Sequence, residues 1–169
     1  MTYRPLQTLI AASTGTLLAA AAIPLAFATE SFEPATSDGA PPFAIEDFTY
    51  PGADSILATK GIELKKGDGH ILLTECDYAA EQIRVSTVKD TTAGRSDMYC
   101  FRATSSTGYL TLTLPRVFAL EASDHPISAD LTANGQTQTI DVAEGGWKAV
   151  GEGTVGGAQS VLVEIRVTG

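Results

Sequence analysis

The sequence has few of the residues from which enzyme active sites are usually built. Its 169 residues include two histidines, two cysteines and one tryptophan, and no Gly-x-Ser-x-Gly motif marks a hydrolase nucleophile. His125 stands before Pro126 in a stretch typical of a solvated turn. His70 follows Asp68 and Gly69, and two such ligands do not complete a zinc site. The sequence therefore predicts no catalytic residue.

Basic side chains are also scarce. The chain has 11 lysines and arginines against 20 aspartates and glutamates, which gives a formal net charge of −9 at pH 7. An acidic chain repels the phosphates of nucleic acids and the headgroups of anionic membranes. We therefore expect no nucleic-acid partner, and the mixing of acids with lysine and arginine is typical of a solvated surface.

Long apolar runs are absent except near the N-terminus. Residues 1–28 contain one cation, Arg4, an apolar stretch at 17–23, then Pro24 and the small-residue pattern Ala26-Phe27-Ala28. This order is typical of a cleavable secretory signal. An uncleaved membrane anchor is the alternative, although Pro24 and the polar run at 13–16 would interrupt it. We predict secretion to the extracellular space, with no membrane contact after signal cleavage.

Residues 29–47 have a composition that differs from the rest of the chain. They are rich in proline, serine and acidic residues, so they cannot bury enough apolar surface to offset the conformational entropy of the chain. We predict a flexible acidic leader over 29–47. Residues 48–169 then form one domain, because their number suits a single core.

A single short helix is expected at the start of this domain. Pro51 suits the first turn of a helix, Ile56 and Leu57 form an apolar patch, and Gly61 can adopt the left-handed conformation that ends it. The rest of the domain consists of short alternating runs separated by glycine, aspartate and proline. This pattern is typical of antiparallel β structure.

The segment 127–142 is the clearest hairpin. Asn134-Gly135 is a favoured pair for a two-residue turn with positive φ at both positions. A turn there pairs Ala133 with Gln136 and continues in register to Ile127 opposite Val142. The apolar residues then lie on one face, as a half-buried hairpin requires.

Other runs predict the remaining strands. Alternation predicts strands with one apolar face at Ile83 and Val85, at Leu110, Leu112 and Leu114, and at Val161, Val163, Ile165 and Val167. The less regular apolar runs at 71–73, 99–101 and 117–120 predict central strands covered on both sides. With eight or nine strands expected, the predicted fold class is all-β: an antiparallel two-sheet β-sandwich or jelly roll with one short N-terminal helix.

The two cysteines, Cys76 and Cys100, are expected to form a disulfide. An even number of cysteines in an exported chain usually pairs in this way. The alternative is a reactive or metal-bound thiol, which needs a cationic neighbour. Cys76 instead stands between Glu75 and Asp77.

Calcium is the one cofactor for which the sequence offers a candidate site. It binds through oxygen ligands alone, and Asp68, Glu75, Asp77 and Glu81 lie close together in the sequence. The ligand pattern of an EF-hand is absent, so an ordinary acidic surface without a cofactor is the alternative.

Trp147, the single tryptophan, lies in the glycine-rich segment 144–157 directly after the hairpin. On a loop at the end of a sandwich its ring can contact a sugar, although such a ring more often folds inward and closes the end. Tyr109 and Tyr99 are weaker candidate ligand contacts of the same kind. The segment does not predict a phosphate site, because Glu152 adds a negative charge and no Gly-Lys-Ser or Gly-Lys-Thr occurs.

Several short strings resemble small secreted proteins of filamentous actinobacteria that have no assigned activity. They are Tyr50-Pro51-Gly52-Ala53-Asp54, Lys60-Gly61-Ile62, Gly67-Asp68-Gly69-His70-Ile71, Tyr99-Cys100-Phe101, Leu114-Pro115-Arg116 and Val150-Gly151-Glu152-Gly153. The resemblance spans roughly residues 48–169. It implies an exported actinobacterial protein and supplies no catalytic residues.

Two classes of function remain open. The first is a secreted, non-enzymatic binding module that recognises an extracellular polysaccharide or protein partner through its loops, with Trp147 in the contact. The second is a small secreted hydrolase that uses His70 or His125. A structural or inhibitory exported protein, acting through its surface alone, is a third reading. The lack of catalytic motifs favours binding.

Overall fold

The computed structural model describes residues 48–169. The predicted signal at 1–28 and the predicted leader at 29–47 lie outside the described residues. Within the described range, no helix is long and apolar enough to cross a membrane.

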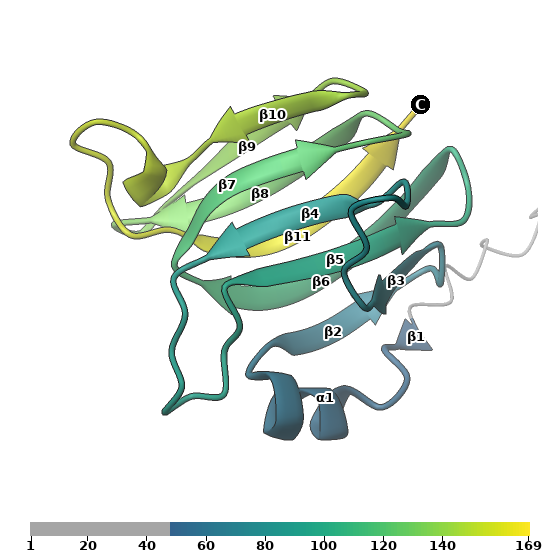
Figure 1. Cartoon of the computed structure of the whole chain (residues 1–169), viewed down its shortest axis with the longest axis horizontal. Coiled ribbons are helices and arrows are strands. Elements are labelled where there is room, and N and C mark those ends of the chain that lie inside the picture. Colours follow the sequence, from purple (N-terminus) through teal and green to yellow (C-terminus); the bar gives the residue numbers. More distant parts are fainter. Residues whose placement is uncertain (1–47) are drawn as a thin grey trace, which may run out of the picture. The chain divides into compact units, whose positions relative to one another are not determined.

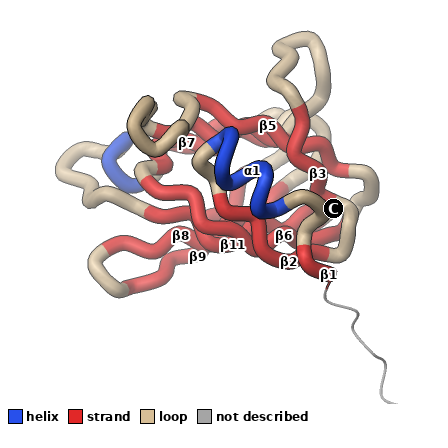
Figure 2. Tube along the Cα trace, turned by 90° about the horizontal axis from the view of Figure 1, so that it is seen from below, coloured by secondary structure: helices blue, strands red, loops and turns tan. Residues whose placement is uncertain are grey.

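Two antiparallel sheets make up the described part of the chain (Figure 1). One sheet has six strands, in the order β1 (Phe48–Thr49), β2 (Glu63–Gly67), β6 (Thr107–Pro115), β11 (Val161–Thr168), β8 (Ile127–Ala133) and β9 (Gln136–Val142). The other has five, in the order β10 (Gly146–Ala149), β7 (Val117–Ala122), β4 (Ile83–Thr87), β5 (Met98–Ala103) and β3 (Ile71–Thr74). Figure 2 shows them as two layers, which confirms the predicted all-β sandwich.

Residues 48–169 form eleven strands rather than the eight or nine expected. The three strands that the sequence did not indicate are β1, β2 and β10, with two, five and four residues. Each is short and exposes more than half of its residues or lies at a sheet edge. Short strands with polar, exposed side chains carry little of the alternation on which strand prediction depends.

The core lies between the two sheets and is built from alternate side chains of the longer strands. Its largest fully buried members include Ile83, Phe101, Leu110, Leu112, Leu114, Leu120, Ile127, Leu162 and Ile165. Burial of such side chains is the main favourable contribution to folding. The outward-facing positions of the same strands face solvent or other segments of the chain.

The helix confirms the predicted element and its end. Helix α1 spans Ala53–Lys60, and Gly61 follows with φ 62°, its N–H donating to the carbonyl of Leu57 at 3.1 Å. A Cβ at Gly61 would also lie 2.3 Å from the carbonyl oxygen of Ala93, so glycine is required there twice over. Pro51 precedes the N-cap Gly52 instead of standing in the first turn. Ile56 packs on the core, whereas Leu57 is exposed.

The β8–β9 hairpin has the predicted turn and register. Asn134 and Gly135 both have positive φ, 50° and 75°. Ala133 pairs with Gln136, and the register continues to Ile127 opposite Val142. The turn alone therefore determined which side chains face the core.

The predicted alternation of β11 is wrong in the first half of the strand. The pairing shifts between Leu162 and Glu164 on both neighbouring strands. Leu162, Ile165 and Val167 are buried as a result, while Val161 and Val163 are only partly so. A β-bulge reverses the faces of the residues on one side of it, and a simple period-two pattern cannot reveal it.

The prediction that residues 71–73 form a central strand is also wrong, because β3 is an edge strand. The edge of β3 that pairs with no other strand is covered by residues of the domain's N-terminal segment. The backbone N–H of Leu73 donates to the hydroxyl of Tyr50 at 2.7 Å, and Tyr50 and Ile56 both pack against the core here. An apolar edge strand covered by other parts of the chain looks like a central strand in the sequence.

Cys76 and Cys100 form the predicted disulfide, with their Cα atoms 5.1 Å apart. Cys100 lies in β5 and is fully buried, and Cys76 follows the end of β3. Cys100 pairs with Thr74 on one side and Arg84 on the other, so the disulfide lies on the outer face of the five-stranded sheet. It attaches the β3–β4 connection, residues 75–82, to that face.

Removing this disulfide should lower stability strongly. For a sequence separation of 24 residues, the chain-entropy model gives a contribution of about 3.5 kcal/mol. We expect the C76A/C100A variant to unfold at a lower urea concentration than the oxidised wild type. Wild-type protein kept in reductant should unfold at about the same midpoint as the variant. An unchanged midpoint in both samples would contradict a stabilising role.

Candidate functional site

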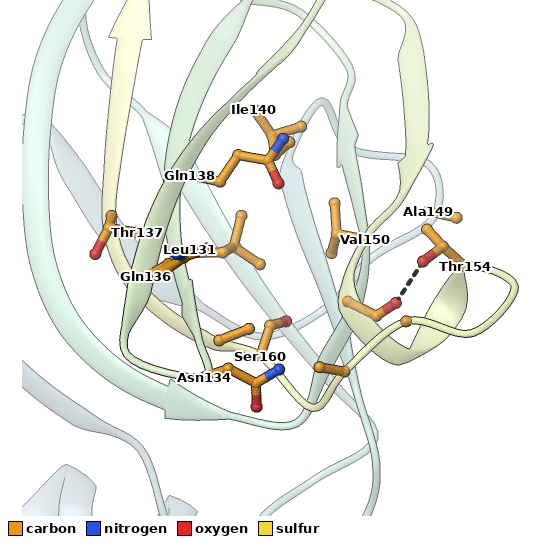
Figure 3. Close-up of a pocket in the computed structure, with 14 residues that line it drawn as sticks. Leu131, Asn134, Gln136, Thr137, Gln138, Ile140, Ala149, Val150, Thr154 and Ser160 are labelled. Atoms are coloured by element: carbon orange, nitrogen blue, oxygen red, sulfur yellow. Dashed lines mark hydrogen bonds between the residues drawn. The ribbon is translucent and has the colours of Figure 1, made fainter.

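A cleft of about 680 Å³ opens between the β8–β9 hairpin and the segment from β10 to the start of β11 (Figure 3). Leu131, Gln138 and Ile140 line it from the hairpin, and Ala149, Val150 and Thr154 line it from the other side. The hairpin extends here beyond the cover of the opposite sheet, because residues 134–139 are all exposed. The cleft is therefore a consequence of two sheets that end at different points.

The cleft is lined by neutral polar groups and small apolar side chains. Its polar lining consists of the amides of Asn134, Gln136 and Gln138 and the hydroxyls of Thr137, Thr154 and Ser160. Ser160 donates to the carbonyl of Val117 at 2.8 Å, and Thr154 donates to the carbonyl of Gly151 at 2.7 Å. No side chain of a described residue bonds to the three amides. These groups suit an uncharged ligand with many hydroxyls.

The glycine-rich wall of the cleft is explained by close packing. A Cβ at Gly153 would lie 2.1 Å from the carbonyl oxygen of Phe118, and one at Gly157 would lie 1.8 Å from that of Gly151. Positions 151–156 do have Gly-x-Gly-x-x-Gly spacing. They form only the three-residue 3₁₀ helix η1 (Gly151–Gly153) and a loop, without the α-helix that follows a phosphate-binding loop.

An ion pair fastens this wall to the sandwich. Arg116 donates through Nε and Nη2 to the two carboxylate oxygens of Glu152, both at 2.7 Å. Arg116 itself has φ 62° in the turn between β6 and β7, a conformation that costs an L-residue free energy. The hydrogen bonds from Arg116 lower the pKa of Glu152 and those to Glu152 raise the pKa of Arg116.

The contribution of this ion pair should depend on pH. Because the pKa of Glu152 is lowered from 4.5 in the folded state, the pair stabilises the protein above that pH and is lost as the pH falls through the lowered pKa. We expect E152Q to melt below the wild type at pH 7 and the difference to shrink at pH 3. E144Q, a change at an exposed glutamate before β10, is the control. A difference independent of pH would contradict this role.

Trp147 lies in β10 and its side chain is exposed, at 62% of the full surface. It pairs with Glu121 of β7, between positions whose side chains are buried, and so projects from the outer face of the five-stranded sheet. The interpretation that the ring folds inward to close the sandwich is therefore wrong. Ala149, two residues along the same strand, lines the cleft, whereas Trp147 is not one of the residues that line it.

The three aromatic residues proposed as ligand contacts do not lie together. Tyr99 is 3% exposed, accepts a hydrogen bond from the N–H of Ser96 and donates to the carbonyl of Lys60. Burial raises the pKa of its phenol. Tyr109 lies in β6 of the other sheet, opposite Arg166. Tyr99 is a structural residue, and of the three only Trp147 projects from the outer face of the five-stranded sheet.

The four carboxylates considered for calcium are not gathered into one group. Among residues 48–169, no three His, Cys, Asp or Glu side chains are placed to hold a metal ion. Glu75 pairs with Lys60 at 2.7 Å, which lowers the pKa of Glu75. Asp68 accepts the N–H groups of His70 and Tyr109 at 3.1 and 3.2 Å. Asp77 accepts the N–H of Ala79 at 2.9 Å, and Glu81 is exposed.

The two histidines are each close to a carboxylate. His70 Nδ1 lies 3.5 Å from Asp68 and 3.1 Å from the carbonyl of Thr107. His125 Nε2 lies 3.7 Å from Asp124. No serine, threonine or cysteine side chain of the described residues hydrogen-bonds to either ring, so neither forms the nucleophile–base contact of a hydrolase.

Sequence analysis missed the polar residues of the cleft, although a signal for them was present. The hairpin register places Gln136 and Gln138 opposite Ala133 and Leu131, on the face that carries the apolar residues. Polar side chains at core-facing positions indicate that the opposite sheet ends before them.

Comparison with known proteins does not assign the site. No protein-family model matches the chain, and no curated protein sequence matches it.

Proposed function

We propose that the protein is exported by its first 28 residues and acts outside the cell as a non-enzymatic binding module. Its ligand is an extracellular polysaccharide, bound at β10, where Trp147 is exposed. The resemblance to exported actinobacterial proteins belongs to the same proposal. A protein partner at this surface is the alternative occupant.

The observation that carries the proposal is the exposure of Trp147 on β10, the strand whose last residue, Ala149, lines a cleft without charged side chains. A large aromatic side chain that is 62% exposed gives up burial that it would obtain in the core. The polar groups of that cleft are amides and hydroxyls, the groups that exchange hydrogen bonds with sugar hydroxyls. Together they match a neutral sugar better than an ionic ligand.

The export part of the proposal agrees with the disulfide and with the acidic composition. Disulfides persist in oxidising compartments, and the Cys76–Cys100 bond is part of the fold. The formal net charge of −9 disfavours polyanionic partners such as nucleic acids.

Replacing Trp147 tests the proposal. We expect W147A protein to lose most of its retention on insoluble polysaccharides, because the ring supplies the stacking surface. Its melting temperature should stay close to that of the wild type, since exposed side chains contribute little to stability. The measurement is pull-down on cellulose, chitin and cell-wall material, with a thermal melt of each variant.

L57A is the matched control, because Leu57 is an exposed apolar residue in α1. It should bind as the wild type does. A large loss of stability in W147A with binding unchanged would reject the proposed contact. If the wild type is retained on none of the polysaccharides, the polysaccharide ligand is rejected and a protein partner is the remaining candidate.

A further inference from the structure

The β3–β4 connection, residues 75–82, is held on the outer face of the five-stranded sheet by a buried arginine. Arg84 is 6% exposed and donates through Nη2 to the carbonyls of Asp77 and Ala80, at 3.2 and 2.8 Å. Through Nη1 it donates to Glu121 at 2.6 Å and to the hydroxyl of Ser123 at 3.1 Å. A buried guanidinium is tolerated only when it has hydrogen-bond partners of this kind. The two hydrogen bonds to the carbonyls of Asp77 and Ala80 also fix the backbone of the β3–β4 connection.

A buried glutamine holds the same connection from within. Gln82 is 4% exposed; its side chain accepts the N–H of Asp77 at 3.0 Å and donates to the carbonyl of Glu75 at 2.9 Å. The disulfide at Cys76 anchors the start of the segment. The connection is therefore fixed by a covalent bond and by two buried polar side chains.

All these contacts surround Tyr78, and the Tyr78 ring is left in solvent. Tyr78 is 79% exposed. Its ring centroid lies 5.5 Å from the Arg84 guanidinium carbon, and its hydroxyl lies 3.7 Å from the sulfur of Met98. The cation–π contact and the anchored backbone limit the positions that the ring can take. An aromatic side chain that is fixed before binding loses little entropy when a ligand stacks on it.

Tyr78 and Trp147 belong to the same outer face. Trp147 pairs with Glu121 across β10 and β7, and Glu121 pairs with Arg84 across β7 and β4. These strands lie side by side in Figure 1. Two strand spacings, roughly 10 Å, therefore separate Trp147 from the arginine over which Tyr78 lies. Glu121, on β7, lies between Trp147 and Arg84 in this row of paired residues.

We infer that Tyr78 and Trp147 are two stacking platforms for one linear, neutral polysaccharide that crosses β4, β7 and β10. This inference rests on the proposed function and identifies its ligand class. The outer face of a sheet is open at both sides, so it accepts the middle of a chain and not only its end. A polymer that reaches both rings contacts them through different sugar units.

The charges of this face favour a neutral polymer. The Arg84 cation is neutralised by Glu121, whose side chain is 40% exposed. The bond to Arg84 uses Oε1 of Glu121, which leaves Oε2 as an acceptor for a sugar hydroxyl in the proposed complex. The acidic chain repels anionic polymers.

The test compares Y78A, W147A, Y78F and the L57A control on cellulose, chitin, xylan and mannan, with polygalacturonate as the anionic probe. We expect the wild type to bind at least one neutral polymer and not polygalacturonate. Y78A and W147A should each weaken that binding about tenfold. Y78F keeps the ring and should bind like the wild type, and thermal melts should show that all variants are folded.

The outcomes separate the inference from the proposed function. Loss of binding in W147A with Y78A unchanged overturns the two-platform inference and leaves the proposed function in place. Binding to no neutral polymer overturns both, and binding to polygalacturonate overturns the neutral ligand class. Sedimentation that shows a dimer dissociated by Y78A or W147A would assign the face to a second copy of the chain and overturn the inference.

Discussion

Each strand of this sandwich can bury only the face that the opposite sheet covers, and the surfaces available for binding follow from that constraint. Where both sheets are present, the inward positions carry leucine, isoleucine and phenylalanine. Where the hairpin extends past the other sheet, the inward positions carry Gln136 and Gln138, and the cleft opens beside them. On the outer face of the five-stranded sheet no third layer exists among residues 48–169, so this face has to be stabilised by side-chain contacts alone.

Arg84 shows how this outer face is organised. Removing a guanidinium from water is expensive, and an apolar residue in its place is often no less stable. An apolar side chain could not, however, bond to two carbonyls of the β3–β4 connection and to Glu121 at once. The arginine therefore specifies the conformation of the connection more than it adds to stability. Together with the disulfide, Arg84 holds the β3–β4 connection in place beneath the exposed ring of Tyr78.

Local rules predicted much of the fold, and non-local pairing accounts for the failures. The Asn134-Gly135 turn determined a complete hairpin register, because turn geometry and side-chain period depend only on neighbouring residues. The same period failed in β11, where a bulge shifts the pairing with both neighbours. It failed again for β3, whose apolar edge is covered by Tyr50 and Ile56 instead of a strand. Whether a strand is central or at an edge depends on partners far away in the sequence.

The candidate site was harder to find than the fold for the same reason. Trp147 was recognisable as a large aromatic residue among glycines, but its direction depends on the pairing of β10 with β7. Tyr78 carried no signal in the sequence. Its backbone and ring are held by contacts with Arg84, Gln82 and the Cys76–Cys100 disulfide. Those contacts distinguish Tyr78 from an ordinary exposed tyrosine, and they depend on residues from other strands. A mobile ring would lose on binding much of the free energy that stacking provides. The proposed binding role of this face therefore depends most on the buried polar contacts beneath Tyr78.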